Sequence, residues 1–228
     1  MCWRCFRPRG QPPSSWNWVW ERGAKAGIHP GYIALEYSEF AIRRYLGPTR
    51  AICGDMQHLP IRGSSVACVV SIAALEHVPL PDLVLAEIDR VLCPGGIVYL
   101  APAWFCRPWA ARDLLGRTYK DLRWRDRMCK AFIPLRDSLI WRGLAALPRR
   151  VLGELRSRVS LRPMPFRYQR LTPNLEEYLT SDSDAFTSMD PLAALMYFVS
   201  RGYDVLNTPG GPRRLFIRHA PLVLRKRG

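Results

Sequence analysis

The sequence predicts an α/β domain with a doubly wound, mostly parallel sheet, and three observations support this fold class. Short apolar runs alternate with helical patterns over residues 31–102, which is the spacing of strand–helix–strand units. One run, Val66–Ser71, is almost continuously apolar, as expected of a strand covered by helices on both faces. Two later apolar runs, separated by a turn rich in proline and glycine, predict a C-terminal antiparallel hairpin.

Each element of residues 31–102 has a local signal. The strands are expected over residues 32–36, 51–53, 66–71 and 97–100. Ser38 is expected to cap a short helix over residues 39–45, because its hydroxyl can accept a hydrogen bond from a free amide. A second helix is expected to begin near Pro81 and to stop before Pro94-Gly95-Gly96. Polar residues that follow parallel strands meet at one edge of the sheet, where ligands bind.

The chain is strongly basic, with 34 Lys and Arg against 19 Asp and Glu and a formal net charge of +15. Residues 104–170 alone hold 17 basic and 5 acidic side chains. Such a stretch fits an anionic partner, namely nucleic acid, an anionic lipid surface or a phosphorylated substrate. The alternative is a solvated basic helical face without a partner.

Composition disfavours several classes of protein. There is no run of 18 apolar residues to predict a membrane-spanning helix, and the N-terminus lacks the apolar region of a secretory signal. Seven scattered cysteines argue against a disulfide framework and for a reducing compartment, so we expect a cytoplasmic protein. Cys2 and Cys5 have the spacing of metal ligands, but no second pair completes a zinc site, and no metal is expected.

Four motifs follow one another in the first half of the chain. They are Gly54-Asp55-Met56-Gln57-His58-Leu59-Pro60-Ile61, Val69-Val70-Ser71, Leu75-Glu76-His77-Val78 and Glu87-Ile88-Asp89-Arg90-Val91-Leu92-Cys93-Pro94-Gly95-Gly96. With these motifs, residues 31–102 resemble the methyltransferase type 11 group of class I S-adenosylmethionine-dependent methyltransferases. The resemblance implies a Rossmann-like methyltransferase fold and S-adenosylmethionine as the cofactor.

The resemblance also implies five cofactor-binding residues. Glu36 matches the acid that binds the ribose hydroxyls, and Asp55 matches the acid that contacts the adenine amine, with Met56 beside the ring. Ser71 and Ile72 match the strand end next to the methionine moiety and the methyl group. Each polar residue has a structural alternative: Glu36 caps the following helix, Asp55 only forms a turn, and Ser71 is a strand-end hydroxyl. The order of the motifs favours the binding site.

His77 is the candidate catalytic residue. As a functional group it would orient the acceptor or act as a general base near neutral pH. As a structural group it would hydrogen-bond to hold the Leu75–Val78 turn. Methyl transfer from a sulfonium is an in-line displacement, so a base is needed only when the acceptor must lose a proton.

Residues 1–30 lack the glycine-rich turn that the family places after its first strand, and they show neither helical nor strand periodicity. Back-translating residues 14–23 and reading one base earlier gives an aliphatic residue, Leu/Val/Met, Glu, Leu, Gly, Leu/Val/Met, Gly, Ala/Thr and Gly/Arg/Trp. This is the missing motif, and its glutamate falls at position 17, about 20 residues before Glu36 as such folds require. We therefore interpret residues 1–30 as an irregular or frameshifted segment. The alternative is coincidence in a tryptophan-rich stretch.

Residues 31–228 are expected to form the methyltransferase domain, with residues 103–170 as a helical, basic insert that serves as an acceptor lid. Its aromatic residues are candidates for an acceptor pocket or for the core; they are Trp104, Trp109, Tyr119, Trp124, Trp141, Phe166 and Tyr168. Within the insert, residues 132–155 place apolar residues and arginines at near-helical spacing, so they either pack on the sheet or lie on an anionic membrane surface. The hairpin is expected from residues 203–206 and 215–218.

Three functions agree with these features. The first is methyl transfer to a small-molecule or glycan-like acceptor, impaired by loss of the glycine loop; the tail around residues 181–185 resembles methyltransferases found among bacterial surface-glycan genes. The acidic side chains of that tail either bind a hydroxyl or amine of the acceptor or pair with arginines. The basic insert favours a second function, an RNA methyltransferase, although no recognised RNA-binding module is present. The missing loop favours a third, a non-catalytic remnant or scaffold.

Overall fold

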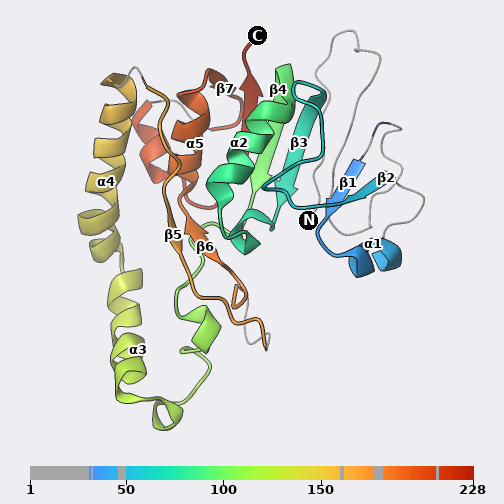
Figure 1. Cartoon of the computed structure of the whole chain (residues 1–228). Helices are drawn as coiled ribbons and strands as arrows, with labels where there is room; N and C mark the ends of the chain where they lie inside the picture. Colours follow the sequence, from blue (N-terminus) through green and yellow to red (C-terminus); the bar gives the residue numbers. More distant parts are fainter. Residues whose placement is uncertain (1–30, 32, 46–49, 160–161, 177–181, 209–210) are drawn as a thin grey trace.

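The computed structural model describes residues 31, 33–45, 50–159, 162–176, 182–208 and 211–228 (Figure 1). The proposed frameshift in residues 1–30 lies outside these residues. The strands are β1 (Ile33–Glu36), β2 (Arg50–Cys53), β3 (Val66–Ile72), β4 (Leu92–Ala101), β5 (Tyr168–Arg170), β6 (Thr187–Met189), β7 (Tyr203–Val205) and β8 (Leu222–Lys226). The helices are α1 (Glu39–Tyr45), α2 (Pro81–Val91), α3 (Trp124–Asp137), α4 (Leu139–Val159) and α5 (Pro191–Val199), with short 3-10 turns η1 (Leu75–His77), η2 (Ala110–Arg112), η3 (Tyr119–Asp121) and η4 (Gly211–Phe216).

The α/β fold class is confirmed. β1 pairs with β2 in parallel, and β3 pairs with β4 in parallel. β8 then lies antiparallel between β4 and β7, so the larger sheet has the order β3-β4-β8-β7. One hydrophobic core joins both parallel pairs, and it includes Leu35 of β1, Val69 of β3 and Leu224 of β8.

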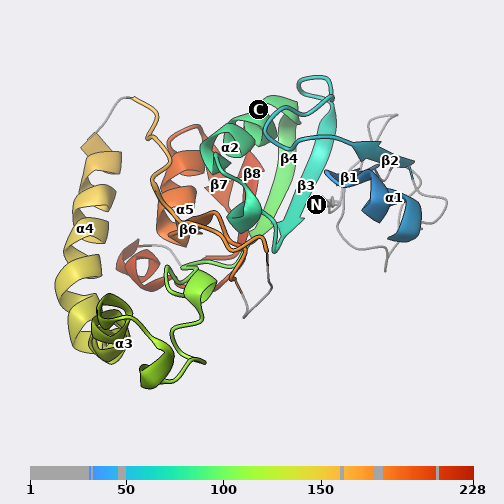
Figure 2. The ribbon, with the colours of Figure 1, turned by 60° about the horizontal axis from the view of Figure 1, so that its bottom comes forward.

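The parallel part of the sheet is divided in two. β1 lies between β2 and β3 in both views, yet β1 and β3 belong to different hydrogen-bonded sheets (Figures 1 and 2). Among the described residues, no strand connects them. The break therefore falls beside β3, where a further parallel strand would complete a continuous sheet.

The C-terminal hairpin is present, but its second strand is Leu222–Lys226 rather than residues 215–218, so that boundary was wrong. Residues up to Phe216 form η4, and Phe216 itself is exposed. β8 inserts between β4 and β7, where its backbone finds partners on both sides and Leu222 and Leu224 are fully buried. Pairing on two edges decides between two apolar runs of similar local pattern.

Pro94-Gly95-Gly96 forms an irregularity within β4, which begins at Leu92 rather than at Ile97 as predicted. The pairing of β3 with β4 changes register across this segment. Gly95 has φ +76, and a Cβ on Gly96 would lie 2.8 Å from the Cys93 carbonyl oxygen and 3.0 Å from the Ala67 carbonyl oxygen. Both positions therefore require glycine, one for its backbone angle and one for the close approach of β3.

Two charged residues of α2 hold the loop between β2 and β3. Glu87 accepts a hydrogen bond from the Leu59 amide at 2.7 Å, and Arg90 donates to the carbonyl oxygens of Leu59 and Ile61 at 2.9 and 2.8 Å. The Arg90 guanidinium, which also bonds Glu87, lowers the pKa of that carboxyl. These two motif residues thus position the Gly54–Ile61 loop rather than contact a ligand.

The insert is mainly helical, as predicted, and its aromatic residues divide between core and surface. Trp104, Trp109 and Phe166 are buried, whereas Trp124 and Trp141 are exposed on α3 and α4. Within the described ranges, no helix combines the length and the apolar character needed to cross a membrane. The same residues contain no cluster of three or more His, Cys, Asp or Glu arranged for a metal ion.

Candidate active site

The predicted cofactor residues lie where β1, β2 and β3 end. β1 ends at Glu36, Asp55 lies two residues beyond β2, and Ser71 and Ile72 close β3. The three strands run toward the same edge of the fold, the lower edge in Figure 1. Parallel strands with common ends place their following residues along one rim, which is where ligands of such sheets bind.

Both carboxylates are engaged in local turns. Glu36 Oε1 accepts the Ser38 amide at 3.1 Å, and the Ser38 hydroxyl accepts the Ala41 amide at 3.3 Å, which confirms Ser38 as the cap of α1. Asp55 accepts the amide and the side-chain nitrogen of Gln57, each at 2.8 Å. Both carboxylates are therefore held in fixed positions at the strand ends by their own loops.

Two residues of β3 differ in exposure. The Ser71 side chain is fully buried and, among the described residues, its hydroxyl has no hydrogen-bond partner, whereas Ile72 is partly exposed. A buried hydroxyl without a partner is rare in folded proteins. Ala73 follows with φ +45, a left-handed conformation that strains a non-glycine residue and recurs at functional sites. Met56 is buried in the main core.

The turn that carries His77 is held by backbone contacts. The amides of His77 and Val78 donate to the carbonyl oxygens of Ala74 and Leu75. The Glu76 carbonyl oxygen accepts the Phe186 amide at 2.8 Å, which docks η1 against the segment before β6. These backbone bonds do not involve the His77 imidazole.

The imidazole instead lies between two carboxylates. His77 Nδ1 is 3.4 Å from Asp184 Oδ2, and Nε2 is 3.9 Å from Glu76 Oε1. Asp184 of the acidic run thus lies at the site, next to a histidine. Sequence separation hid this arrangement, because more than a hundred residues lie between His77 and Asp184.

Glu76 is a site residue that sequence reasoning missed. Its side chain is 2% exposed, yet within the described part of the chain Oε2 has no hydrogen-bond partner. Burial raises the pKa of the Glu76 carboxyl above its ordinary value, although its own amide, His77 and the Ala103 amide oppose this shift. Burial, with the nearby Asp182 and Glu76 carboxylates, also raises the pKa of the Cys106 thiol. A basic chain therefore holds a local acidic centre beside His77.

The raised pKa of Glu76 predicts a stability that depends on pH. A carboxyl whose pKa is higher when folded supports the fold below its unfolded pKa of 4.5 and loses that contribution as pH rises through the folded value. Glu76→Gln should therefore be about 1–3 kcal/mol more stable than the parent at pH 8, with the difference fading toward pH 4. Urea unfolding at both pH values measures it, and exposed Glu39→Gln is the control; a parent more stable than Glu76→Gln at pH 8 contradicts the prediction.

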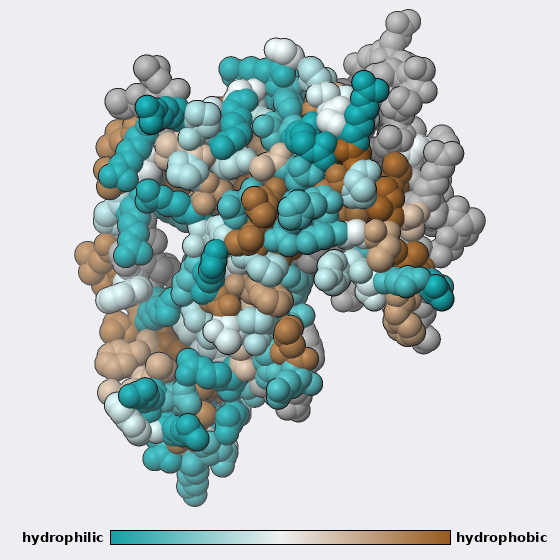
Figure 3. All heavy atoms as spheres, viewed as in Figure 1, coloured by the Kyte–Doolittle hydropathy of each residue, from teal (hydrophilic) through white to brown (hydrophobic). Residues whose placement is uncertain are grey.

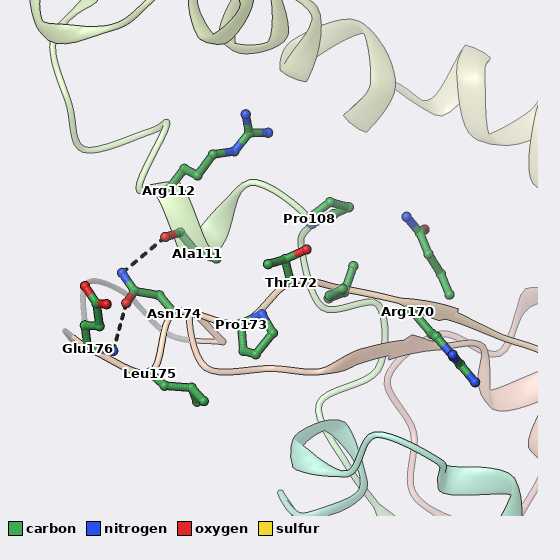
Figure 4. Close-up of a pocket in the computed structure, with 11 residues that line it drawn as sticks. Pro108, Ala111, Arg112, Arg170, Thr172, Pro173, Asn174, Leu175 and Glu176 are labelled. Carbon is green, nitrogen blue, oxygen red and sulfur yellow. Dashed lines mark hydrogen bonds between the residues drawn. The ribbon is translucent and has the colours of Figure 1, made fainter.

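A pocket lies on the insert side of the molecule (Figure 4). Its volume is about 670 Å³, and it is lined by Pro108, Ala111, Arg112, Gln169, Arg170, Leu171, Thr172, Pro173, Asn174, Leu175 and Glu176. Asn174 anchors its wall by donating to the Ala111 carbonyl oxygen at 3.3 Å, and the Asn174 amide donates to Ser183 beside Asp184. The five predicted cofactor residues do not line this pocket.

Comparisons with known proteins identify the first part of the fold. A methyltransferase domain family matches residues 24–100. An uncharacterized chloroplastic methyltransferase of Arabidopsis thaliana is 32% identical over 116 residues, which cover 42% of this chain and 33% of that protein. A malonyl-[acyl-carrier protein] O-methyltransferase of Dechloromonas aromatica (strain RCB) is 36% identical over 76 residues, which cover 32% of this chain and 29% of that protein.

The chain thus matches about a third of the length of these curated relatives. A solved S-adenosylmethionine-dependent methyltransferase of Methanosarcina mazei is similar over 86% of this chain and 82% of its own, at 15% identity and a TM-score of 0.38. The family match covers β1 through β4, the part that carries the four motifs. Residues 24–100 of this chain are thus similar to a methyltransferase domain.

Proposed function

We propose that this protein, with an intact first strand and glycine loop, transfers a methyl group from S-adenosylmethionine to a small-molecule or glycan-like acceptor. The observation that carries the proposal is the common edge of β1, β2 and β3, where Glu36, Asp55 and Ser71 follow parallel strands. In this proposal residues 31–228 form the methyltransferase domain, and residues 103–170 cover the acceptor.

The residues present fit an adenosyl group in their chemistry. Glu36 accepts from the ribose hydroxyls and Asp55 from the adenine amine, since a carboxylate at each strand end is a charged hydrogen-bond acceptor. Ser71 and Ile72 bound the end of the site that faces the reacting methyl, and Met56 packs beneath it from the core. S-adenosylmethionine supplies the activated methyl group when bound. The chain's own contribution is to orient the acceptor in line with it.

In this proposal His77 takes a proton from the acceptor when the acceptor must lose one. Asp184, 3.4 Å from Nδ1, stabilises the imidazolium that results, and Glu76 offers its unpartnered oxygen to a hydroxyl or amine. The pocket beside this segment supports an acceptor position on the insert side, because amide, guanidinium and hydroxyl groups line it. Such a lining suits a molecule rich in hydroxyl groups.

Binding of S-adenosylhomocysteine tests the cofactor side directly. In a chain whose residues 16–23 are restored to the neighbouring reading frame, Glu36→Ala and Asp55→Ala should each weaken binding by about 10- to 100-fold, because each removes a charged hydrogen-bond acceptor. Isothermal titration calorimetry measures the change. Glu39→Ala is the matched control, since Glu39 is exposed on α1 and pairs with Arg43. Unchanged affinity in both Glu36→Ala and Asp55→Ala would overturn the assignment of this edge.

A further inference from the structure

Helices α3 and α4 each expose large apolar side chains on one face, and these side chains together are called the strip. Large apolar side chains are exposed on both helices: Trp124, Met128, Phe132 and Leu135 on α3, and Ile140, Trp141, Leu144, Val151, Leu152 and Leu155 on α4. At about 100° per residue, the four on α3 fall within an arc of about 80°, and the six on α4 within about 120°. The strip is visible as brown side chains along the left margin of Figure 3.

The opposite face of α4 packs against α5 and the segments beside it, through an arginine and a glycine. Arg150 is nearly buried, bonds both carboxylate oxygens of Asp190 at 2.7 and 2.9 Å, and donates to the Leu215 carbonyl oxygen. Gly153 approaches Met196 of α5 so closely that a Cβ would lie 3.3 Å from it. These contacts fix the rotation of α4. The helix therefore presents its apolar side outward, the reverse of an ordinary surface helix.

The α3 helix is oriented in the same way. Ile133 lies on the side opposite the strip, where it is buried in a small core with Trp109, Leu114 and Leu122. Arg136 stacks over the Trp109 ring at 5.2 Å. The exposed strip is thus set by packing on the other side of both helices.

Positive charge borders the strip. Residues 124–159 contain nine Lys and Arg against three Asp and Glu, an excess of six positive charges. Arg125 on α3, and Arg149 and Arg156 on α4, are exposed and project just beyond the edge of the apolar arc. One of the three acids, Asp126, is paired with Arg112. An apolar strip with basic borders is complementary to a surface whose outer layer is anionic and whose interior is apolar.

We propose that α3 and α4 bind the surface of an anionic lipid bilayer, with the strip at the boundary between headgroups and acyl chains and the arginines at the phosphates. The inference goes beyond methyl transfer and does not depend on it. RNA is a poorer fit, because seven of the ten side chains in the strip are aliphatic or Met, whereas single-stranded nucleic acid is bound by stacking on aromatic side chains. An embedded strip also gives Trp124 and Trp141 the interfacial position that tryptophan favours.

Vesicle co-sedimentation of the full chain tests the proposal. The chain should bind vesicles of phosphatidylcholine with about one-third phosphatidylglycerol, bind pure phosphatidylcholine much less, and lose affinity as salt rises. The double variant Ile140→Glu with Leu144→Glu should lose at least about tenfold in affinity, because it puts two charges into the strip. Both side chains are 73% exposed, so folding should be unaffected, and thermal unfolding checks this. Phe40→Glu, an equally polar change on exposed α1, is the control that should retain binding.

Three results would overturn the proposal. The first is equal vesicle binding by the parent and by the double variant. The second is a parent that fails to bind anionic vesicles but forms a dimer in sedimentation velocity that the double variant loses, which assigns the strip to a second copy of this chain. The third is binding of single-stranded RNA without binding of vesicles, which assigns the basic border to nucleic acid.

Discussion

Restoring residues 16–23 to the neighbouring reading frame should raise the affinity for S-adenosylhomocysteine by at least about 100-fold. The restored residues read as an apolar strand followed by a glycine-rich turn, and the described sheet is broken where such a strand would lie, between β1 and β3. A glycine turn at that edge aims backbone amides at the ligand. Two or three such bonds, at about 1 kcal/mol each, account for a change of this size.

Calorimetry on the chain as it stands and on the restored chain measures this difference. A restored chain in which the two new glycines are replaced by valine is the matched control, since it keeps the strand and removes the turn. Equal affinity in the first two chains, or an undisturbed reading frame in resequenced DNA upstream of Gly31, contradicts the frameshift hypothesis. A restored chain that still fails to bind supports the remnant or scaffold instead, because the nucleoside site would then be absent.

His77→Ala should lower the rate of methyl transfer by about 100- to 10,000-fold for an acceptor that must lose a proton, the range expected of a general base. The reason is the geometry of the imidazole, which is partly exposed and lies 3.4 Å from Asp184. The acidic limb of the pH–rate profile should disappear in the variant, because a base acts only when deprotonated. Transfer of tritiated methyl to a panel of sugars, phenols and amines, with the restored chain, provides the measurement.

Asp184→Asn is the companion variant and should lose about tenfold, because it leaves the base in place and removes only the charge that stabilises the imidazolium. S-adenosylhomocysteine binding should be unchanged in both variants, since neither residue lies at the predicted nucleoside edge. A rate and pH profile in His77→Ala equal to those of the parent would show that alignment alone drives the transfer and that His77 has no catalytic role.

The elements of residues 31–102 were predictable because their signals are local. Ser38 caps α1 with its own hydroxyl, and the Val66–Ser71 run becomes β3 whatever its neighbours are. Gly95 and Gly96 are evident in the sequence, but the role of Gly96 could not be predicted from it. The close approach of Gly96 to Ala67 exists only when β3 and β4 pair. The hairpin boundary failed for the same reason. Two apolar runs have similar local patterns, and only Leu222–Lys226 pairs with both β4 and β7.

The sequence by itself determined the α/β fold, the order of the motifs and the acids that follow the strands, because periodicity and strand-end chemistry lie within a few consecutive residues. Only the tertiary structure decided that His77 lies beside Asp184 and that Glu76 is buried. It also decided that α4 turns Arg150 inward and Leu144, Leu152 and Leu155 outward. Those outcomes depend on which distant surfaces pack together. Whether a side chain is buried depends on the whole fold. A local sequence pattern indicates which residues are suited to burial, but not which of them become buried.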